Sequence, residues 1–539
     1  MSFVKSILPV ETIIPQLHHA LALGDVILVA PPGAGKSTCV PLSLLTLAQF
    51  SEQKIIMLQP RRIAARNIAH YLAKQLGEDV GQTVGYRIRG ESRSSKATRL
   101  EIVTEGILTR MLQSNPELPG VGLVIFDEFH ERSIHADFSL ALCLEVQDAL
   151  RDDLRLLIMS ATLDVASLSE LLPRAKQIAC EGRSYPVEIY YRPNSTNASL
   201  VEKVVSLTTF AAAEHQGDIL VFLPGQGEIL RCARLLEQKI TSDVKIHCLF
   251  SQQNLVTQEA ALMADPDGKR KIILATNIAE TSLTIEGITV VVDSGMKKSA
   301  VYQLSKGLTQ LHSHMISKSS ATQRMGRAGR LSSGVCYRLW SKEQHQRLVE
   351  HGQAEILTSD LSPFLLEASV WGAKIDDLAL IDMPSDAQRK QAHSVLMGLQ
   401  VLDEHHHVSA HGKAVHVLGG QANIATMLLK SKALGAGHQS LACAIAVLLE
   451  DKDPLGNQAG SLCYARLSLL QQQKSHPLWR GIRQWYKKLG CGDASWPLDD
   501  TGVLLGFAFP QWIGKSSATG RYALVDGTGG QLSDNDPLV

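Results

Sequence analysis

The sequence lacks several features that would each define a class of protein. Its nine cysteines are scattered and include no C-x-x-C pair, which argues against a zinc ribbon or a disulfide framework and favours a reducing compartment. No apolar run approaches the length of about 18 residues that a membrane-spanning helix needs. No short-period repeat or heptad array is present either. We therefore expect a protein that neither crosses a membrane nor depends on disulfides.

An excess of charge of one sign is also absent. Lys plus Arg and Asp plus Glu number 53 each, so a nucleic-acid partner must be bound by a local basic patch rather than by net charge. The N-terminus does not resemble a signal peptide, because Glu11 and two prolines interrupt its apolar stretch. Together these features predict a soluble, cytoplasmic protein without a membrane partner.

What the sequence does contain is a repeated α/β pattern. The chain of 539 residues is 45% hydrophobic and 20% charged, enough to bury several cores. Short runs rich in Val, Ile and Leu alternate with longer segments of helical spacing. The first set of runs covers 25–30, 54–59, 100–105, 122–127 and 154–160, and the second covers 218–224, 245–250, 270–277, 287–295 and 334–340. Because the runs are apolar throughout, they predict strands covered on both faces, as in parallel sheets.

The two sets are separated by "GRSYPVEIYYRPNSTNAS", a polar, proline-containing stretch that we interpret as a linker. After about residue 345 the strand runs give way to helical patterns, such as "LSPFLLEASVWG" and "HQSLACAIAVLLE". The predicted fold class is α/β, with two tandem parallel-sheet domains followed by mostly helical modules. The predicted boundaries are 1–180 and 181–345 for the sheet domains, then 346–415, 416–505 and 506–539.

A phosphate-binding loop is predicted at "DVILVAPPGAGKST", residues 25–38. Strand, glycine-rich turn and helix follow in the order that G-x-x-x-x-G-K-[ST] requires, although Ala30 occupies the first glycine position. The expected ATP-binding residues are Pro32, Gly33, Ala34, Gly35, Lys36, Ser37 and Thr38. Lys36 should reach the β and γ phosphates, and the Ser37 hydroxyl should bind Mg²⁺. An ordinary Gly-rich turn is the alternative. Ala30 should be tolerated if its φ stays negative.

Two adjacent carboxylates, Asp127 and Glu128, end the apolar run in "VIFDEFHERS". In a parallel sheet this end lies at the same edge as the phosphate loop. We expect Asp127 to hold Mg²⁺ near Ser37 and Glu128 to polarise the water that attacks the γ phosphate. The alternative is a solvated surface pair.

These motifs resemble those of the superfamily 2 DEAH-box helicases. "DEFH" is similar to the DEAH signature with Phe129 in place of alanine, and "SAT" at Ser160–Thr162 follows the next strand. In family order come "QPRRIAAR", "TEGILTR", "VFLPGQGEI", "ATNIAETSLTIEG" and "QRMGRAGR", which with the phosphate loop span roughly residues 25–335. Later segments resemble the helical C-terminal modules of the family.

The resemblance implies two RecA-like domains with ATP bound between them, then winged-helix-like (346–415) and ratchet-like (416–505) modules. Residues 506–539 are expected to begin a further C-terminal domain. From "QRMGRAGR", Arg327 and Arg330 are implied as arginine fingers and Gln323 as a residue that orients the attacking water. His130 is implied to link the ATP site to "SAT".

The resemblance also implies contacts to a nucleic-acid strand. The expected RNA-binding residues are Arg61, Arg62, Thr104 and Arg87 in the first domain and Gly225, Thr276 and Asn277 in the second. Such contacts position a backbone without reading its sequence, so binding should be salt-dependent. For any one of these positions, an ordinary surface residue is the alternative.

Three further features have simpler alternatives. The segments "VYQL" and "LTQLH" flank "SKG" and predict a β-hairpin, which in the family helps to separate strands but can be purely structural. "EHHH" at 404–407 is interpreted as a wing turn rather than a metal site. The aromatic and basic segment "HPLWRGIRQWYKKLG" is interpreted as a helix with one buried face rather than a base-stacking surface. The family often stacks adenine on an aromatic side chain of the second domain. The corresponding segment "EAALMADPDG" contains no aromatic residue, so other nucleoside triphosphates should be tolerated.

The leading hypothesis is an ATP- and Mg²⁺-dependent RNA helicase or translocase, moving 3′ to 5′ by resemblance on single-stranded RNA or a tailed RNA duplex, as a monomer. A DNA helicase or translocase is the second hypothesis, because no residue identifies a 2′-hydroxyl contact. A nucleotide-switched RNA clamp or assembly factor is the third. A metabolic kinase is least favoured, since a small acceptor needs no second RecA-like domain.

Overall fold

The computed structural model describes residues 8–161, 165–182, 185–193, 197–241, 243–253, 255–280, 285, 287–330, 332–456 and 460–539. The chain forms two compact units. The first comprises residues 1–301, 309–359 and 379–383, and the second comprises 302–308, 360–378 and 384–539. None of the described helices is both long enough and apolar enough to cross a membrane.

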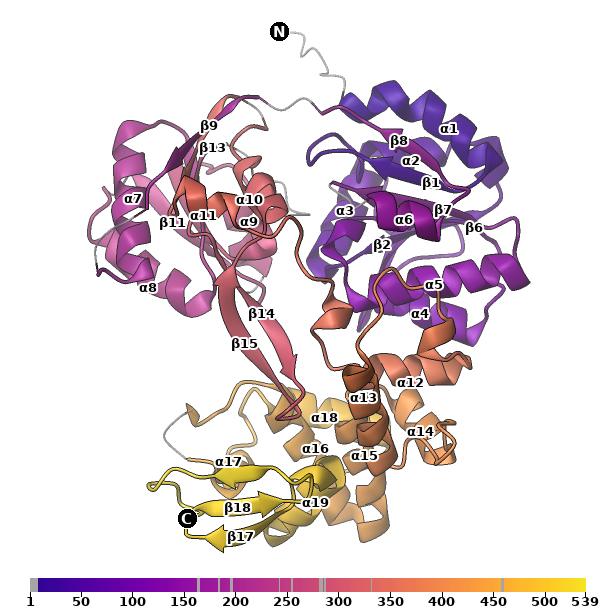
Figure 1. Ribbon diagram of the computed structural model, residues 1–539, viewed down its shortest axis with the longest axis vertical. Coiled ribbons are helices and arrows are strands. Elements are labelled where there is room, and N and C mark those ends of the chain that lie inside the picture. The colour runs from indigo at the N-terminus through magenta and orange to yellow at the C-terminus, as the bar shows by residue number, and fades with distance from the viewer. Residues whose placement is uncertain are drawn as a thin grey trace. The chain divides into compact units, whose positions relative to one another are not determined.

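The first sheet of the first unit has eight strands in the order β4-β3-β5-β2-β6-β7-β1-β8 (Figure 1). Their bounds are β1 Val26–Val29, β2 Lys54–Gln59, β3 Val84–Ile88, β4 Glu91–Arg93, β5 Leu100–Thr104, β6 Val121–Phe126, β7 Arg155–Ser160 and β8 Lys176–Ala179. All neighbouring pairs are parallel except β3 and β4. The predicted parallel sheet is confirmed.

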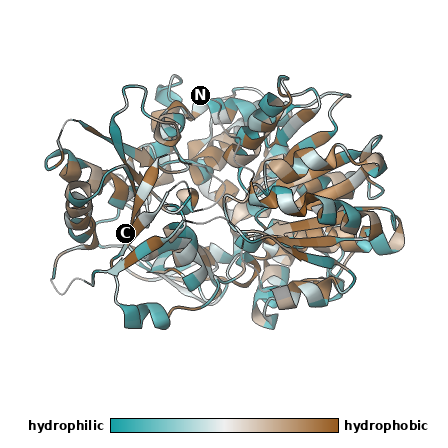
Figure 2. Ribbon diagram, turned by 90° about the horizontal axis from the view of Figure 1, so that it is seen from above, coloured by the Kyte–Doolittle hydropathy of each residue, from teal (hydrophilic) through white to brown (hydrophobic). Residues whose placement is uncertain are grey.

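Helices cover both faces of this sheet. They are α1 Ile14–Leu23, α2 Cys39–Leu44, α3 Arg62–Gln75, α4 Glu105–Ser114, α5 Ile134–Ala149 and α6 Val165–Leu171. Side chains of α1, α2 and α3 share one apolar core with alternate residues of β1 and β2, such as Val26, Leu28 and Met57. Helices α4 and α5 pack against each other on the other face (Figure 1). This two-sided burial explains why the strands are apolar throughout and appear hydrophobic in Figure 2.

The second sheet has six parallel strands in the order β11-β12-β10-β13-β16-β9. The bounds are β9 Val187–Tyr191, β10 Asp218–Phe222, β11 Val244–Leu249, β12 Arg270–Ala275, β13 Ile288–Asp293 and β16 Gly334–Arg338. The accompanying helices are α7 Leu200–Glu214, α8 Gln226–Glu237, α9 Leu255–Leu262, α10 Lys318–Met325 and α11 Lys342–Gln346. Separate apolar cores lie on its two faces, with α7 and α8 in one and α9 in the other.

Four strands of these two sheets lie where none was predicted. The stretch interpreted as a linker contains β9, which pairs with β16 at the edge of the second sheet. β8, at one edge of the first sheet, was also missed, as were β3 and β4 at the opposite side of that sheet. β8 and β9 are edge strands with many exposed side chains, so they lack the continuous apolar run of a central strand. β3 is largely buried, but Gly85 and Arg87 interrupt its apolar run. The predicted hairpin is confirmed as β14 Met296–Gln303 and β15 Leu308–Met315, with Gly307 at a φ of 62°.

The second unit is mainly helical. It contains α12 Ser362–Trp371, α13 Asp386–Gly398, α14 Ala410–Leu418, α15 Ala422–Lys430, α16 Ala436–Glu450, α17 Cys463–Gln472, α18 Trp479–Leu489 and α19 Thr501–Ala508. An antiparallel bridge between Leu402 and Val408 encloses the predicted wing turn. In α18, Ile482 and Tyr486 are buried while Arg483 and Lys487 are exposed, which confirms the one-sided burial predicted for this helix.

The expectation that strands end near residue 345 is wrong for the C-terminal segment. Residues 514–531 form a three-stranded antiparallel sheet of β17 Gly514–Ala518, β18 Arg521–Leu524 and β19 Gly529–Gln531. These strands are short, rich in Gly and Ser, and mostly exposed. Hydrophobic patterning therefore gave no signal for them.

Candidate nucleotide and nucleic-acid sites

The predicted phosphate loop joins β1 to α2. Gly33 and Gly35 have φ angles of 85° and 97°, in the left-handed region that favours glycine. A side chain at Gly35 would also meet Leu8 and Val10 at 3.0–3.1 Å, whereas the space beside Gly33 is open. Ala30 is fully buried and is not among the residues with positive φ, so the expectation that it is tolerated at the first glycine position is confirmed.

Lys36 of this loop forms a buried ion pair with Glu128. Its Nζ donates to Glu128 Oε2 at 2.9 Å, and the two side chains are 4% and 10% exposed. Burial alone would raise the pKa of the Glu128 carboxyl, but the charges of Lys36, His130 and Arg327 outweigh it and lower the pKa to about 2. Glu128 is therefore an ionised carboxylate at neutral pH.

Asp127 lies beside this pair and contacts Ser37, the other predicted Mg²⁺ ligand. Burial and the adjacent charge of Glu128 raise the pKa of Asp127 to about 6, although Lys36 and hydrogen bonds from the side chains of Ser37 and Gln59 oppose the increase. The structure thus brings the hydroxyl and the carboxylate predicted to hold Mg²⁺ together at the carboxyl edge of the first sheet. Oxygen ligands of this kind are those that Mg²⁺ prefers.

The loop that carries both acids has an unusual backbone. Glu128 and Arg132 have φ angles of 51° and 49°, a left-handed conformation that is costly for residues other than glycine. The side chain of His130, in the same loop, is 8% exposed, and its Nδ1 accepts a hydrogen bond from the main-chain N–H of Ala161 at 3.3 Å. This contact joins the "DEFH" loop to "SAT" as predicted, while Thr162 lies outside the described residues.

The arginines of "QRMGRAGR" lie in and after α10. Gln323 and Arg327 are buried, and Arg327 Nε donates to the main-chain carbonyl of Glu280 at 3.1 Å. Burial lowers the pKa of Arg327, and the neighbouring charge of Arg330 lowers it further, while Glu128 acts in the opposite direction. Burial likewise lowers the pKa of Arg330 to about 10 against the attraction of Glu128.

Two cations that are crowded and desolvated in this way favour an anionic ligand. Arg330 also has a buried Nε without a hydrogen-bond partner among the described residues. With Lys36, these guanidinium groups form a set of donors suited to a polyphosphate.

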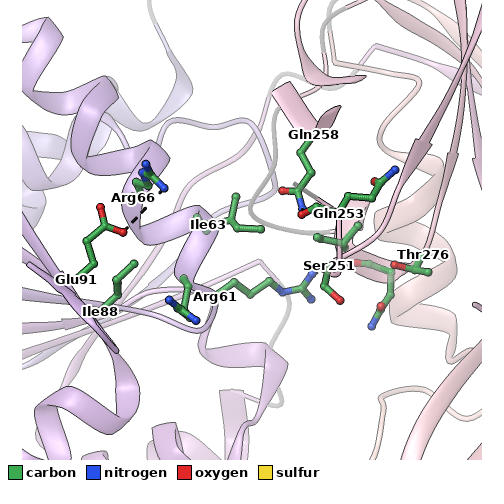
Figure 3. A pocket seen from close by; sticks show the side chains of 13 residues that line it. Arg61, Ile63, Arg66, Ile88, Glu91, Ser251, Gln253, Gln258 and Thr276 are labelled. Carbon is green, nitrogen blue, oxygen red and sulfur yellow. Dashed lines mark hydrogen bonds and ion pairs between the residues drawn. The ribbon is translucent and has the colours of Figure 1, made fainter. Parts of the chain in front are cut away.

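A second candidate site is a cavity of about 570 Å³ (Figure 3). It is lined by Arg61, Arg62, Ile63, Ala64, Arg66, Ile88, Glu91, Ser251, Gln253, Gln258, Thr276, Asn277 and Ile278. The lining thus includes four of the predicted RNA-binding residues. Arg61 links the two sheets of the first unit, since its guanidinium donates to the carbonyl of Asn277 at 3.4 Å and pairs with Glu131 at 3.3 Å.

The other three predicted RNA-binding residues do not line this cavity. Arg87 on β3 pairs with the buried Glu101 at 2.8 Å. Thr104 precedes α4 at its N-cap, and Gly225 precedes α8. A side chain at Gly225 would meet Lys298 Nζ at 2.9 Å.

Sequence reasoning missed a buried amide next to Asp127. Gln59 is fully buried, and its Nε2 donates to Asp127 Oδ2 at 2.5 Å. It is the last residue of the apolar run 54–59, so the strand-end argument that identified Asp127 applies equally to it. Glu280 and Arg324, which hold Arg327 in place, were also missed, because only the folded structure brings these residues together.

Comparison with known proteins agrees with this arrangement. Residues 11–171 match the DEAD/DEAH box helicase family and residues 199–332 match the helicase conserved C-terminal domain. The chain is 43% identical to the ATP-dependent RNA helicase HrpB of Escherichia coli K12, over 99% of this chain and 65% of that protein. It is 36% identical to the ATP-dependent RNA helicase HrpA of Borreliella burgdorferi, over 75% of this chain and 50% of that one.

Solved structures show the same relationship. A crystal structure of E. coli DEAH/RHA helicase HrpB matches with a TM-score of 0.88 and 42% identity, covering 98% of this chain and 67% of that one. A second, of E. coli DExH-box NTPase HrpB, matches with a TM-score of 0.85 at 42% identity, covering 100% and 66%. The chain thus spans about two thirds of the length of its HrpB relatives. These matches, with the motifs at the two sites, show that the chain belongs to the DEAH-box helicase family.

Proposed function

We propose that this protein is an ATP-dependent RNA helicase that couples hydrolysis of a nucleoside triphosphate to movement on single-stranded RNA, in the 3′ to 5′ direction. The observation that carries the proposal is the arrangement around Glu128. The carboxylate pairs with Lys36 of the phosphate loop and interacts electrostatically with Arg327 and Arg330, which come from the other sheet. Both halves of a nucleotide site thus converge on one side chain.

In the proposed reaction, an incoming triphosphate competes with Glu128 for Lys36. The amino group turns to the β and γ phosphates, and Glu128, released from its ion pair, accepts a proton from the attacking water. Gln323 orients that water, and Arg327 and Arg330 donate to the γ phosphate as negative charge develops on it. Ser37 and Asp127 would hold Mg²⁺, and a bound Mg²⁺ would neutralise charge on the phosphates.

The proposed path of the strand includes the cavity in Figure 3. Arg61 and Arg62 lie on one side and Thr276 and Asn277 on the other, so a backbone bound there contacts residues of both sheets. If the two sheet domains part after hydrolysis, the contacts on one side move relative to those on the other. The proposed domain boundaries remain 1–180 and 181–345, followed by the winged-helix-like, ratchet-like and C-terminal modules.

The test is the steady-state ATPase rate of the full chain with single-stranded RNA, with DNA of the same sequence and without nucleic acid, together with strand release from a 3′-tailed RNA duplex. RNA stimulation and strand release are expected. Equal stimulation by DNA would favour the translocase alternative, and hydrolysis without strand release would favour a clamp.

Glu128→Gln provides the internal control for this assay. Because the amide cannot accept the proton, turnover should fall by roughly 10²- to 10⁴-fold. Binding of a fluorescent ATP analogue should persist, since the amide no longer competes for Lys36. Normal turnover in this variant would remove Glu128 from its proposed role.

A further inference from the structure

We propose that Glu280 is a positioning residue for the arginine pair, and that a buried chain of ion pairs, Glu280–Arg324–Asp293, connects it to the base of the β14–β15 hairpin. The inference rests on the proposed function, because it concerns how the nucleotide site communicates with the hairpin. Every contact in the chain lies within the first unit. None of these three residues was identified from the sequence.

Glu280 is bound on all three of its oxygen atoms. Its main-chain carbonyl accepts from Arg327 Nε at 3.1 Å. Its carboxylate accepts from Arg324 Nε at 2.9 Å through Oε2 and from the Ser320 hydroxyl at 2.6 Å through Oε1. The residue also follows Asn277–Ala279, so it lies two positions after Ile278, which lines the cavity. Glu280 is thus fixed to α10 by its side chain while its backbone holds Arg327.

Arg324 links Glu280 to Asp293. Its side chain is 1% exposed, packs over the ring of Phe222 at 4.8 Å and donates from Nη1 to Asp293 Oδ1 at 2.9 Å. One buried guanidinium therefore joins two carboxylates that belong to different elements. Such a group has a small number of satisfied arrangements, because an unpaired charge in this position is strongly unfavourable.

Asp293 fixes the base of the hairpin. It is the last residue of β13, is fully buried, and its Oδ1 also accepts from the main-chain N–H of Gly295 at 2.9 Å. Gly295 has a φ of 73°, and its carbonyl accepts from the N–H of Ile316 at 2.9 Å. Strand β14 begins directly after Gly295, and β15 ends directly before Ile316. The carboxylate that pairs with Arg324 therefore also sets where the hairpin starts.

A gain in stability alone gives these ion pairs little reason to be buried. Buried ion pairs contribute less to stability than well-packed apolar side chains of similar volume, and their best-attested use is to specify one arrangement. Here the specified arrangement joins Arg327 at one end to the hairpin base at the other. Displacement of Arg327 by a change at the γ phosphate is thereby transmitted to the hairpin.

The experiment uses the full chain and compares Glu280→Gln and Asp293→Asn with a matched control, Asp218→Asn. Asp218 also pairs with a buried cation of the second sheet, Lys271, at 3.7 Å, but it lies at the start of β10, at the opposite end of the strands. We expect the kcat for RNA-stimulated hydrolysis to fall at least tenfold in both test variants with KM for ATP within twofold. The control should lose thermal stability without this change in kcat.

Two further measurements separate positioning from general damage. If Glu280 acts through Arg327, the Glu280→Gln/Arg327→Ala double variant should be no slower than Arg327→Ala alone. Asp293→Asn should also reduce the number of base pairs opened per ATP hydrolysed, because the hairpin base is no longer tied to Arg324. Additive losses in the double variant, or equal kcat losses in the Asp218→Asn control, would overturn the inference. If the unmodified chain shows no RNA-stimulated hydrolysis, the proposed function fails instead.

Discussion

At the scale of single residues, Glu105 is a buried carboxyl outside the nucleotide site that should make stability depend on pH. It begins α4 and accepts a hydrogen bond from the Ser133 hydroxyl at 2.5 Å. Burial raises its pKa from an ordinary 4.5 to about 7, and the nearby acids Glu131, Glu355 and Asp137 add to the increase. The folded protein therefore holds this proton more tightly than the unfolded chain does.

The sign of the effect follows from that difference. Between about pH 4.5 and 7 the folded state binds more protons at Glu105 than the unfolded state, so this group's contribution to stability decreases as pH rises through that window. A pKa difference of this size corresponds to roughly 3 kcal/mol at most. We therefore compare the melting temperature of Glu105→Gln with that of the unmodified protein at the same pH. This difference should favour the variant more at pH 8 than at pH 5. The exposed Glu52→Gln should show no such trend, and a constant difference across pH would contradict the prediction.

The residues of the nucleotide site could be predicted from the sequence to the extent that short motifs encode them. Lys36, Ser37, Asp127 and Glu128 each follow a buried strand, and ends of parallel strands meet at one edge whatever the details of packing. The partners of these residues are different. Glu280 is 47 residues from Arg327 in sequence and contacts it through a main-chain carbonyl, a bond that no residue type specifies.

At the scale of elements, the sequence predicted those strands that form continuous apolar runs, and it missed the largely buried β3, whose run contains Gly85 and Arg87. β2 and β6 are buried almost throughout and were evident as apolar runs. β9 and β17 lie at sheet edges or on exposed faces, and their side chains are mostly accessible to solvent. Pairing by main-chain hydrogen bonds leaves no hydrophobic pattern when neither face is covered, so such strands are visible only in the folded structure.

The 3-10 turn Phe129–Glu131 after the two site acids is held to α5 and to a later segment by Arg132. Arg132 donates to Asp137 at 3.0 Å and to Asp382 at 2.7 Å. The Asp137 side chain is 2% exposed, whereas that of Asp382 is 38% exposed. The two ion pairs should therefore differ greatly in their contribution to stability.

Replacing Arg132 or its exposed partner Asp382 tests this difference. Arg132→Ala leaves the Asp137 carboxylate buried without its cation and should lower the free energy of unfolding by roughly 3–5 kcal/mol. Asp382→Ala removes only the exposed partner and should cost about 1 kcal/mol or less. Urea unfolding followed by tryptophan fluorescence measures both. Similar losses in the two variants would show that exposure does not govern these pairs.

At the scale of the whole molecule, charge is balanced overall, with 53 basic and 53 acidic side chains. Attraction to a nucleic-acid backbone must therefore come from where the charges lie. The cavity that joins the two sheets is lined by Arg61, Arg62 and Arg66 against a single acid, Glu91. A phosphate backbone bound there releases counterions from a few contacts rather than from a broad basic surface.

The salt dependence of RNA binding therefore tests whether the RNA strand passes through this cavity. For single strands, each phosphate contact contributes a slope of about −0.7 to log K against log salt. The Arg61→Ala/Arg62→Ala variant should bind RNA more weakly, and the slope of log K against log salt should be shallower by roughly 1.4. The loss of affinity should be similar for uridine-only and mixed sequences, because backbone contacts carry no base information. Arg174→Ala, an exposed arginine outside the cavity lining, provides the control. Fluorescence anisotropy with labelled oligonucleotides at several salt concentrations measures the slopes, and an unchanged slope in the double variant would place the strand elsewhere.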